Sequence, residues 1–232
     1  MAALELFKTK LYTDANLVAY WRCEGNSNDS KGSNNGTNTS MSYNASYGKF
    51  GQGANFSGSG YISLTNTNFK PGGDFTFTTW LKDSTTGVGQ TIWQSYYNIG
   101  NPQGWSMEIE TTNLIKIVQG DGVSLINNTG GSSVCDGVFH WICGVYDSTT
   151  HITTVYVDGS SSWSTSAYAL SFNASSNTSF GHRSNTGGDD GVKLTGYQDD
   201  SAFFSRKLTA AEITAHWNGT DGLGTGNFFM MM

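Results

Sequence analysis

The chain of 232 residues carries few charges, because Lys, Arg, Asp and Glu make up only 13% of it. An average soluble domain has about 25%. The 12 basic residues are scattered singly, and the formal net charge is -6. Nucleic-acid binding depends on clustered basic side chains that neutralise phosphates, so the sequence predicts no nucleic-acid partner.

Long apolar runs are also lacking. No stretch approaches the roughly 18 consecutive apolar residues that a membrane-spanning helix requires, so the sequence predicts no membrane span. The first residues show no basic segment followed by an apolar one, which is the pattern of a secretory leader. Either a leader has been removed or the chain is made without one, and the presence of Met1 favours the second interpretation.

Cysteine is scarce, with three residues that cannot all pair within one chain. Cys135 and Cys143 are close enough in the sequence for a disulfide to be considered. We favour the other interpretation, in which Cys143 is a small buried apolar residue of an alternating strand. There is no C-x-x-C pair, and the four His show no metal-ligand spacing, so no zinc site is predicted.

What the chain does contain is typical of a β-sandwich. Hydrophobic residues make up 37% and aromatic residues 13%, which is ample core material, and 30 Gly with many Asn, Ser and Thr separate short apolar runs. This alternation predicts an antiparallel sandwich with many turns. The length fits one large domain of this kind. Strands are expected, among others, over residues 17–21, 75–81, 167–172 and 195–204.

Two segments are especially informative. Residues 140–159 read as two strands of alternating side chains joined by a turn. Residues 194–218 read as a strand followed by the only good helix of the chain. Thr209 and Glu212 form the T-x-x-E pattern of a capping box. Ile213 and Trp217 lie four residues apart, so this face of the helix is expected to dock on the sandwich.

With these elements in place, the chain resembles the laminin G-like, concanavalin A-like lectin jelly-roll family. The resemblance rests on five segments in the family's order, residues 17–37, 47–64, 74–82, 139–159 and 196–218. It implies an all-β fold, a two-sheet antiparallel jelly-roll sandwich with one short C-terminal helix. The domain is expected to span residues 17–218, after an N-terminal extension (1–16) and before a C-terminal tail (219–232).

The resemblance also implies a calcium site between the opening loop and the closing strand. The candidate ligands are Glu24, Asp29, Asp199 and Asp200, whose carboxylates are the hard oxygen ligands that calcium prefers. Adjacent strand residues point to opposite faces, so only one of Asp199 and Asp200 is expected to face the ion. The alternative for Asp29 is a role in forming a turn.

Aromatic residues suggest a glycan site. Trp93, Tyr96 and Tyr97 precede the polar segment 98–104, and exposed rings in such a place would stack against sugars. The alternative for each ring is packing in the core.

Catalysis is disfavoured. Glycoside hydrolases on this scaffold need paired carboxylates, about 5–5.5 Å apart in retaining enzymes. The nearest match is Glu108 with Glu110, and the third acid of the family's E-x-D-x-x-E motif is missing. The sequence therefore predicts a protein that is not an enzyme.

The preferred prediction is a non-enzymatic structural or binding protein, a surface or decoration subunit of a virion (a phage capsid, tail or filament). Its expected location is the virion surface or another extracellular place. Its expected partners are further copies of itself, other virion or surface proteins, and cell-surface glycans. The alternatives are a secreted bacterial carbohydrate-binding or adhesion module and, less favoured, a glycoside hydrolase.

Overall fold

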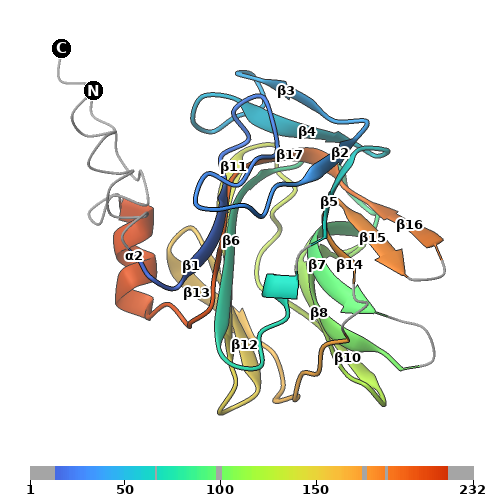
Figure 1. Cartoon of the computed structure of the whole chain (residues 1–232), viewed down its shortest axis with the longest axis vertical. Coiled ribbons are helices and arrows are strands. Elements are labelled where there is room, and N and C mark those ends of the chain that lie inside the picture. Colours follow the sequence, from blue (N-terminus) through green and yellow to red (C-terminus); the bar gives the residue numbers. More distant parts are fainter. Residues whose placement is uncertain (1–13, 66, 98–100, 174–176, 186–187, 219–232) are drawn as a thin grey trace.

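The computed structural model of the chain describes residues 14–65, 67–97, 101–173, 177–185 and 188–218. These residues form two large antiparallel sheets, A and B, that pack face to face (Figure 1). The predicted fold class, a two-sheet jelly roll with one C-terminal helix, is confirmed. Most of the predicted extension 1–16 and all of the tail 219–232 lie outside the described residues.

Sheet A has the strand order β13-β12-β11-β6-β17-β4-β3, and β1 pairs with β17. Its strands are β1 (Leu17–Trp21), β3 (Ser42–Asn44), β4 (Gly53–Ser57), β6 (Phe75–Lys82), β11 (Phe139–Asp147), β12 (Ile152–Val157), β13 (Ser160–Ser164) and β17 (Thr195–Phe204). The predicted hairpin over 140–159 is therefore the pair β11–β12.

Sheet B has the strand order β10-β9-β8-β7-β14-β5-β2. Its strands are β2 (Thr37–Thr39), β5 (Tyr61–Leu64), β7 (Gln90–Tyr97), β8 (Gln103–Ile109), β9 (Ile115–Asp121), β10 (Leu125–Gly130) and β14 (Asn177–Phe180). A separate hairpin, β15 (His182–Asn185) with β16 (Gly188–Lys193), contacts β7, and a short 3-10 turn, η1 (Thr67–Phe69), follows β5.

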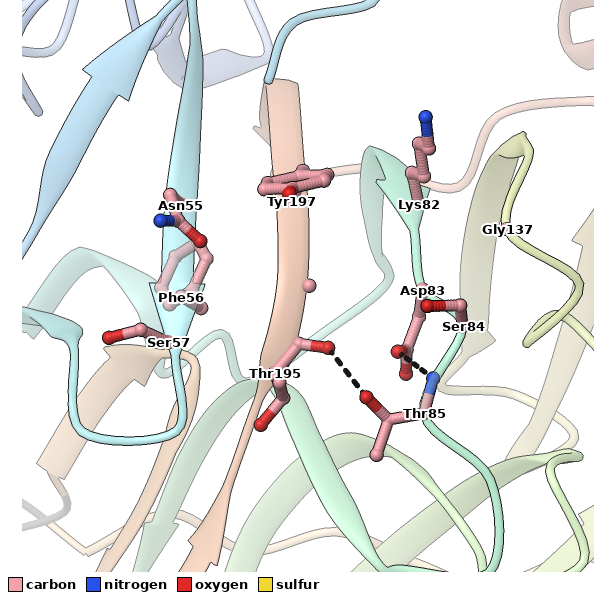
Figure 2. Close-up of a pocket in the computed structure, with 11 residues that line it drawn as sticks. Asn55, Phe56, Ser57, Lys82, Asp83, Ser84, Thr85, Gly137, Thr195 and Tyr197 are labelled. Carbon is pink, nitrogen blue, oxygen red and sulfur yellow. Dashed lines mark hydrogen bonds between the residues drawn. The ribbon is translucent and has the colours of Figure 1, made fainter. Parts of the chain in front are cut away.

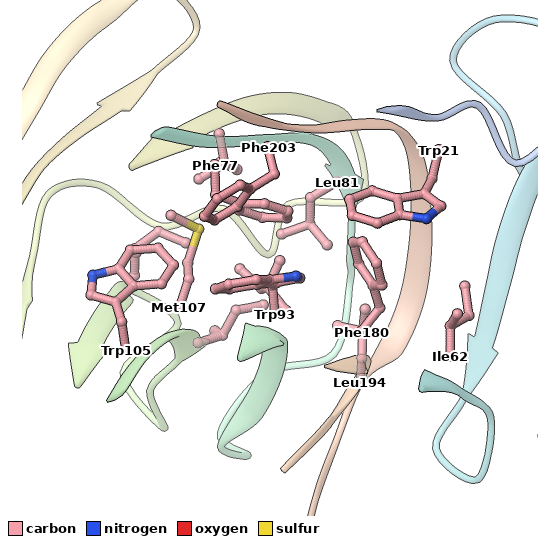
Figure 3. Close-up of a cluster of buried hydrophobic side chains, with 14 of the residues drawn as sticks. Trp21, Ile62, Phe77, Leu81, Trp93, Trp105, Met107, Phe180, Leu194 and Phe203 are labelled. Atoms are coloured by element: carbon pink, nitrogen blue, oxygen red, sulfur yellow. The ribbon is translucent and has the colours of Figure 1, made fainter. Parts of the chain in front are cut away.

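The core lies between the two sheets and is rich in aromatic rings (Figure 3). Side chains alternate along each strand, so Phe75 and Phe77 of β6 point into this core while Trp80 points to the other face of sheet A. Trp93 of sheet B stacks on Phe77 with 5.0 Å between ring centroids. Rings from both sheets therefore interdigitate, which fixes how the sheets face each other.

The outer face of sheet A carries a second apolar layer, partly covered by helix α2 (Ala210–Asn218) (Figure 1). Ile213 is fully buried, and the Trp217 ring lies 5.4 Å from the Trp80 ring. The Glu212 backbone N–H donates to the Thr209 hydroxyl (3.2 Å), and the Thr209 N–H donates to the Glu212 carboxylate (2.8 Å). The predicted capping box and docking face are both confirmed.

The three cysteines are free and buried. Cys143 lies in β11 within the outer apolar layer, as the preferred interpretation predicted. Desolvation raises the pKa of its thiol above the ordinary range, so Cys143 stays a neutral packing residue. In the described part of the chain, no helix is long and apolar enough to cross a membrane.

Candidate functional site

The candidate site lies on the outer face of sheet A, across three neighbouring strands. Tyr197 of β17 is paired with Asn55 of β4 on one side and with Lys82 of β6 on the other. Residues directly opposite each other in adjacent strands face the same way, so the three side chains form one row. Figure 2 shows Asn55 and Lys82 on either side of the Tyr197 ring. We call this the Asn55–Tyr197–Lys82 row.

A pocket of about 590 Å³ opens along this row, within the size range of small-ligand sites. Gly196 contributes to the pocket lining and packs closely against β6, since an added Cβ would lie 2.8 Å from the Lys82 carbonyl oxygen. Hydroxyl groups surround the floor, contributed by Ser57, Ser84, Thr85 and Thr195. The pocket thus combines one aromatic ring with an amide, an ammonium group and several hydroxyls.

The Tyr197 ring is held in place by a second tyrosine. Tyr47, in the connection between β3 and β4, stacks on Tyr197 with 4.9 Å between centroids and 11° between ring planes. A ring fixed in this way loses little conformational entropy when a ligand binds to it. The stack therefore pre-organises the aromatic part of the site.

Hydrogen bonds below the row fix the polar wall. Asp83 is buried, and its carboxylate accepts the Thr85 N–H (2.7 Å) and the Gln90 side-chain amide. The side-chain Oε1 of Gln90 in turn accepts the Thr195 N–H (2.7 Å). The Thr85 hydroxyl donates to the Thr195 carbonyl oxygen (3.2 Å; Figure 2). These bonds join the loop after β6 to β17, so the pocket exists before any ligand arrives.

The aromatic residues predicted to bind glycan lie elsewhere. Trp93 is 1% exposed and Tyr96 is 4% exposed, so neither ring is available for stacking on a sugar. The prediction is wrong for these two, because β7 is a central strand of sheet B and its side chains are covered on both faces. The backbone of Tyr97 ends β7, and its side chain lies outside the described residues.

Sequence reasoning missed the row because Tyr197 stood in a segment that was used only as a fold signal. The available signal was the alternation of β17. Phe203 faces the core, and successive residues of a strand point to opposite faces. Counting back from Phe203 therefore predicts which side chains of β17 point outward, although a bulge between Asp199 and Ala202 interrupts the alternation. The pairing that brings Asn55 beside Tyr197 joins segments about 140 residues apart, and no local pattern predicts it.

Asp29, a predicted calcium ligand, organises the opening loop. Its Oδ1 accepts the backbone N–H groups of Tyr20 (3.0 Å) and Lys31 (2.8 Å). Its Oδ2 accepts the Asn34 backbone N–H (3.0 Å) and side-chain amide (2.8 Å). Four donors thus satisfy both oxygens, which supports the alternative interpretation of Asp29 as a loop-forming residue.

Asp199 and Asp200 are engaged in a similar way. Asp199 Oδ2 accepts the N–H groups of Lys49 and Phe50, each at 2.8 Å, and its Oδ1 accepts the Asp200 N–H at 2.9 Å. Asp200 has a φ of 44°, and the Tyr20 hydroxyl donates to its Oδ1 at 2.6 Å. The expected strict alternation fails here, because a bulge interrupts β17 and both carboxylates bond to groups of the outer layer.

Glu24 completes the set of predicted ligands. Its carboxylate accepts the Gln52 N–H (3.1 Å) and pairs with Arg22 (3.3 Å). Within the described ranges, no group of three or more His, Cys, Asp or Glu side chains is arranged to hold a metal ion. The four carboxylates therefore do not fit one calcium site, because most of their oxygens already accept N–H or O–H donors.

A melting experiment tests this disagreement with the predicted calcium site. An ion bound only by the folded state raises the melting temperature in proportion to the logarithm of its concentration. Because the carboxylates are satisfied by the chain itself, we expect the same melting temperature in EDTA and in millimolar calcium chloride. A rise with calcium that EDTA reverses would restore the predicted site.

The Asp199–Asp200 pair predicts a pH dependence of stability. Burial, followed by the neighbouring Asp200 charge, raises the pKa of Asp199, and burial raises the pKa of Asp200. A carboxyl group whose pKa is raised by folding stabilises the fold most below its unfolded pKa of about 3.9. This contribution to the free energy of unfolding is lost as the pH rises through the raised pKa of the folded state. Wild-type stability should therefore decline from about pH 4 towards alkaline pH through these two groups.

The variant Asp200→Asn tests this dependence, since asparagine cannot ionise but still accepts the Tyr20 hydroxyl. We expect it to be more stable than wild type at pH 8, by about 1 kcal/mol, with a smaller difference at pH 5. Urea midpoints at the two pH values measure this. A variant that is equally destabilised at both would show that the Asp200 charge itself supports the fold.

Basic side chains neutralise Glu108 and Glu110, the pair of carboxylates that was considered for hydrolysis. Glu108 is 1% exposed, and its carboxylate lies 2.8 Å from Lys116 Nζ and 3.3 Å from Arg183 Nη1. Lys116 Nζ also pairs with Glu110 at 3.1 Å. A hydrolase needs one carboxyl group free to donate a proton and another free to attack or activate water. Because Glu108 and Glu110 both pair with the Lys116 ammonium group, neither carboxyl group is free for these two roles.

The comparisons with known proteins agree with the fold. The profile of the concanavalin A-like lectin/glucanases superfamily matches residues 56–214, more than half of the sequence. The chain therefore belongs to this superfamily. No curated protein matches it significantly.

Solved structures resemble the chain in fold at low sequence identity. The binding domain of Paraclostridial Mosquitocidal Protein 1 is 17% identical with a TM-score of 0.70, over 90% of this chain and 53% of that one. Botulinum neurotoxin type C, which depends on two ganglioside molecules for getting into cells, is 15% identical with a TM-score of 0.68, over 91% and 52%. The chain thus spans about half the length of these two toxin chains.

A further similar structure is a complete small domain. Domain 4 of AbnA, an extracellular arabinanase from Geobacillus stearothermophilus solved with arabinotriose, is 17% identical with a TM-score of 0.67. The alignment covers 86% of this chain and 97% of that domain. At these identities the three likenesses show a shared fold and leave function to be argued from the site itself.

Proposed function

We propose that this chain is a non-catalytic, extracellular glycan-binding module whose site is the pocket along the Asn55–Tyr197–Lys82 row. The observation that carries the proposal is the row itself, in which a pre-oriented tyrosine ring lies between an amide and an ammonium group beside a hydroxyl-lined pocket. Sugars present apolar C–H faces and many hydroxyls, and rings with nearby polar groups are the usual partners for such ligands.

Two further observations support this function. The arabinanase domain that shares the fold was solved with arabinotriose, and the neurotoxin interacts with gangliosides, so sugar-binding proteins occur among the similar structures. The only paired carboxylates considered for hydrolysis are held by Lys116. An attachment role outside the cell therefore suits the chain better than hydrolysis.

Replacing Tyr197 with alanine tests the proposal. Loss of an aromatic anchor at the centre of a binding site costs about 2 kcal/mol or more, so we expect affinity for the glycans that the wild type binds to fall at least about 20-fold. The measurement is a screen of wild type and variant against immobilised oligosaccharides, followed by calorimetric titration of the best ligand.

Tyr61→Ala is the matched control for this variant. Tyr61 is also a partly buried strand tyrosine with a stacked ring, 4.5 Å from the His182 ring, but it lies on sheet B. We expect this variant to keep wild-type affinity. Equal losses in both variants, or retained binding by Tyr197→Ala, would reject the pocket as the glycan site.

The virion role and self-assembly predicted from the sequence remain predictions.

A further inference from the structure

Lys82 has no acidic partner among the residues that the structure describes. Five other basic residues form ion pairs with carboxylates: Arg22, Lys116, Arg183, Arg206 and Lys207. Within the described residues, the Lys82 ammonium contacts only the face of the Phe139 ring, 5.7 Å from its centroid. Its stem is thereby held in place while its charge stays available to a ligand.

The acidic residues near the pocket are turned to other partners. The Asp83 carboxylate is buried and accepts the Thr85 N–H and the Gln90 amide. Asp136, next to the pocket residue Gly137, accepts the Val138 N–H (3.0 Å) and bonds to the His140 ring (3.1 Å). Neither carboxylate forms an ion pair with Lys82, so the Lys82 ammonium stays available to an anionic group of a ligand.

We propose that the pocket selects acidic saccharides, with Lys82 binding a sugar carboxylate while the same or an adjoining sugar ring stacks on Tyr197. This inference rests on the proposed glycan-binding function and specifies its ligand class. The strand register fixes Lys82 and Tyr197 as direct neighbours, so one ligand can reach both. Asn55, on the far side of the ring, is then available for a sugar hydroxyl.

The shared chemistry is a carboxylate on a pyranose ring, which uronic acids and sialic acids both carry. The test therefore uses two matched pairs of probes: trigalacturonic acid with its methyl ester, and sialyllactose with lactose. Charge-assisted hydrogen bonds are stronger than neutral ones, so we expect wild type to bind at least one acidic probe about 10-fold more tightly than its neutral partner. The pair that shows the difference identifies the source of the carboxylate.

Three lysine variants assign the preference. Lys82→Met keeps the apolar stem beside Phe139 and removes the charge, so we expect the acidic and neutral probes to bind equally. Lys82→Arg should keep the preference. Lys49→Met is the matched control, because Lys49 lies on the same sheet face with its Nζ 4.6 Å from the Trp80 ring, outside the pocket lining. It should bind like wild type.

The outcomes separate this inference from the function on which it rests. Equal wild-type affinity for acidic and neutral probes, with both lost in Tyr197→Ala, would overturn the acidic preference and leave glycan binding in place. A preference lost equally in Lys82→Met and Lys49→Met would also overturn it, since the effect would then follow net charge. Binding of no saccharide, or binding that Tyr197→Ala leaves unchanged, would overturn both proposals.

Discussion

Replacing Trp93 with alanine is expected to lower the free energy of unfolding by about 3–5 kcal/mol, as for other buried tryptophans. Trp93 is almost fully buried, and its ring packs 5.0 Å from Phe77, 5.5 Å from Phe203 and 5.6 Å from Trp105 (Figure 3). The substitution leaves a cavity between the two sheets where rings from both meet. Urea unfolding, followed by circular dichroism, measures the loss.

The conservative variant Trp93→Phe separates packing from sugar binding. It preserves most of the apolar volume, so it should fold and bind the wild-type glycan with unchanged affinity. A folded Trp93→Phe that loses glycan binding would contradict the assignment of Trp93 to the core and restore the role predicted from the sequence.

Replacing Asp29 with alanine is expected to cost on the order of 3 kcal/mol of stability. The change leaves the N–H groups of Tyr20, Lys31 and Asn34 without their acceptor in a partly buried loop. Buried donors without partners are among the more costly defects in a folded protein. Denaturant midpoints of wild type and variant measure the effect.

Asp29→Asn is the control for this prediction, since one of its side-chain atoms still accepts hydrogen bonds and the other does not. Its loss should lie between those of wild type and Asp29→Ala. All variants are measured both with and without EDTA. If EDTA alone weakens the wild type as much as the alanine substitution does, Asp29 acts as a metal ligand and the hydrogen-bond explanation is contradicted.

Much of the fold follows from local patterns in the sequence. Strands β1 and β17 have the predicted bounds, and Thr209 caps the helix as expected, because alternation and capping depend on neighbouring residues. The strand expected over 167–172 is wrong. Tyr168 and Ser171 instead donate their N–H groups to the carbonyls of His151 and Gly120, so this segment crosses between strands and forms no ladder.

The candidate site was harder to predict because it depends on strand order. Trp93 and Tyr96 share one strand, and only the packing of β7 inside sheet B shows that both rings are covered. Asn55, Tyr197 and Lys82 come from three distant segments, and their neighbourhood exists only through the order β6-β17-β4. Composition indicates that such polar and aromatic residues are present, whereas their convergence requires the tertiary structure.

The most direct test of this account is a crystal structure with the oligosaccharide that the chain binds most tightly. We expect a sugar ring stacked on Tyr197, in the pocket bounded by Asn55 and Lys82 (Figure 2). A sugar bound on the outer face of sheet B, or at another surface with this pocket empty, would contradict the proposed site.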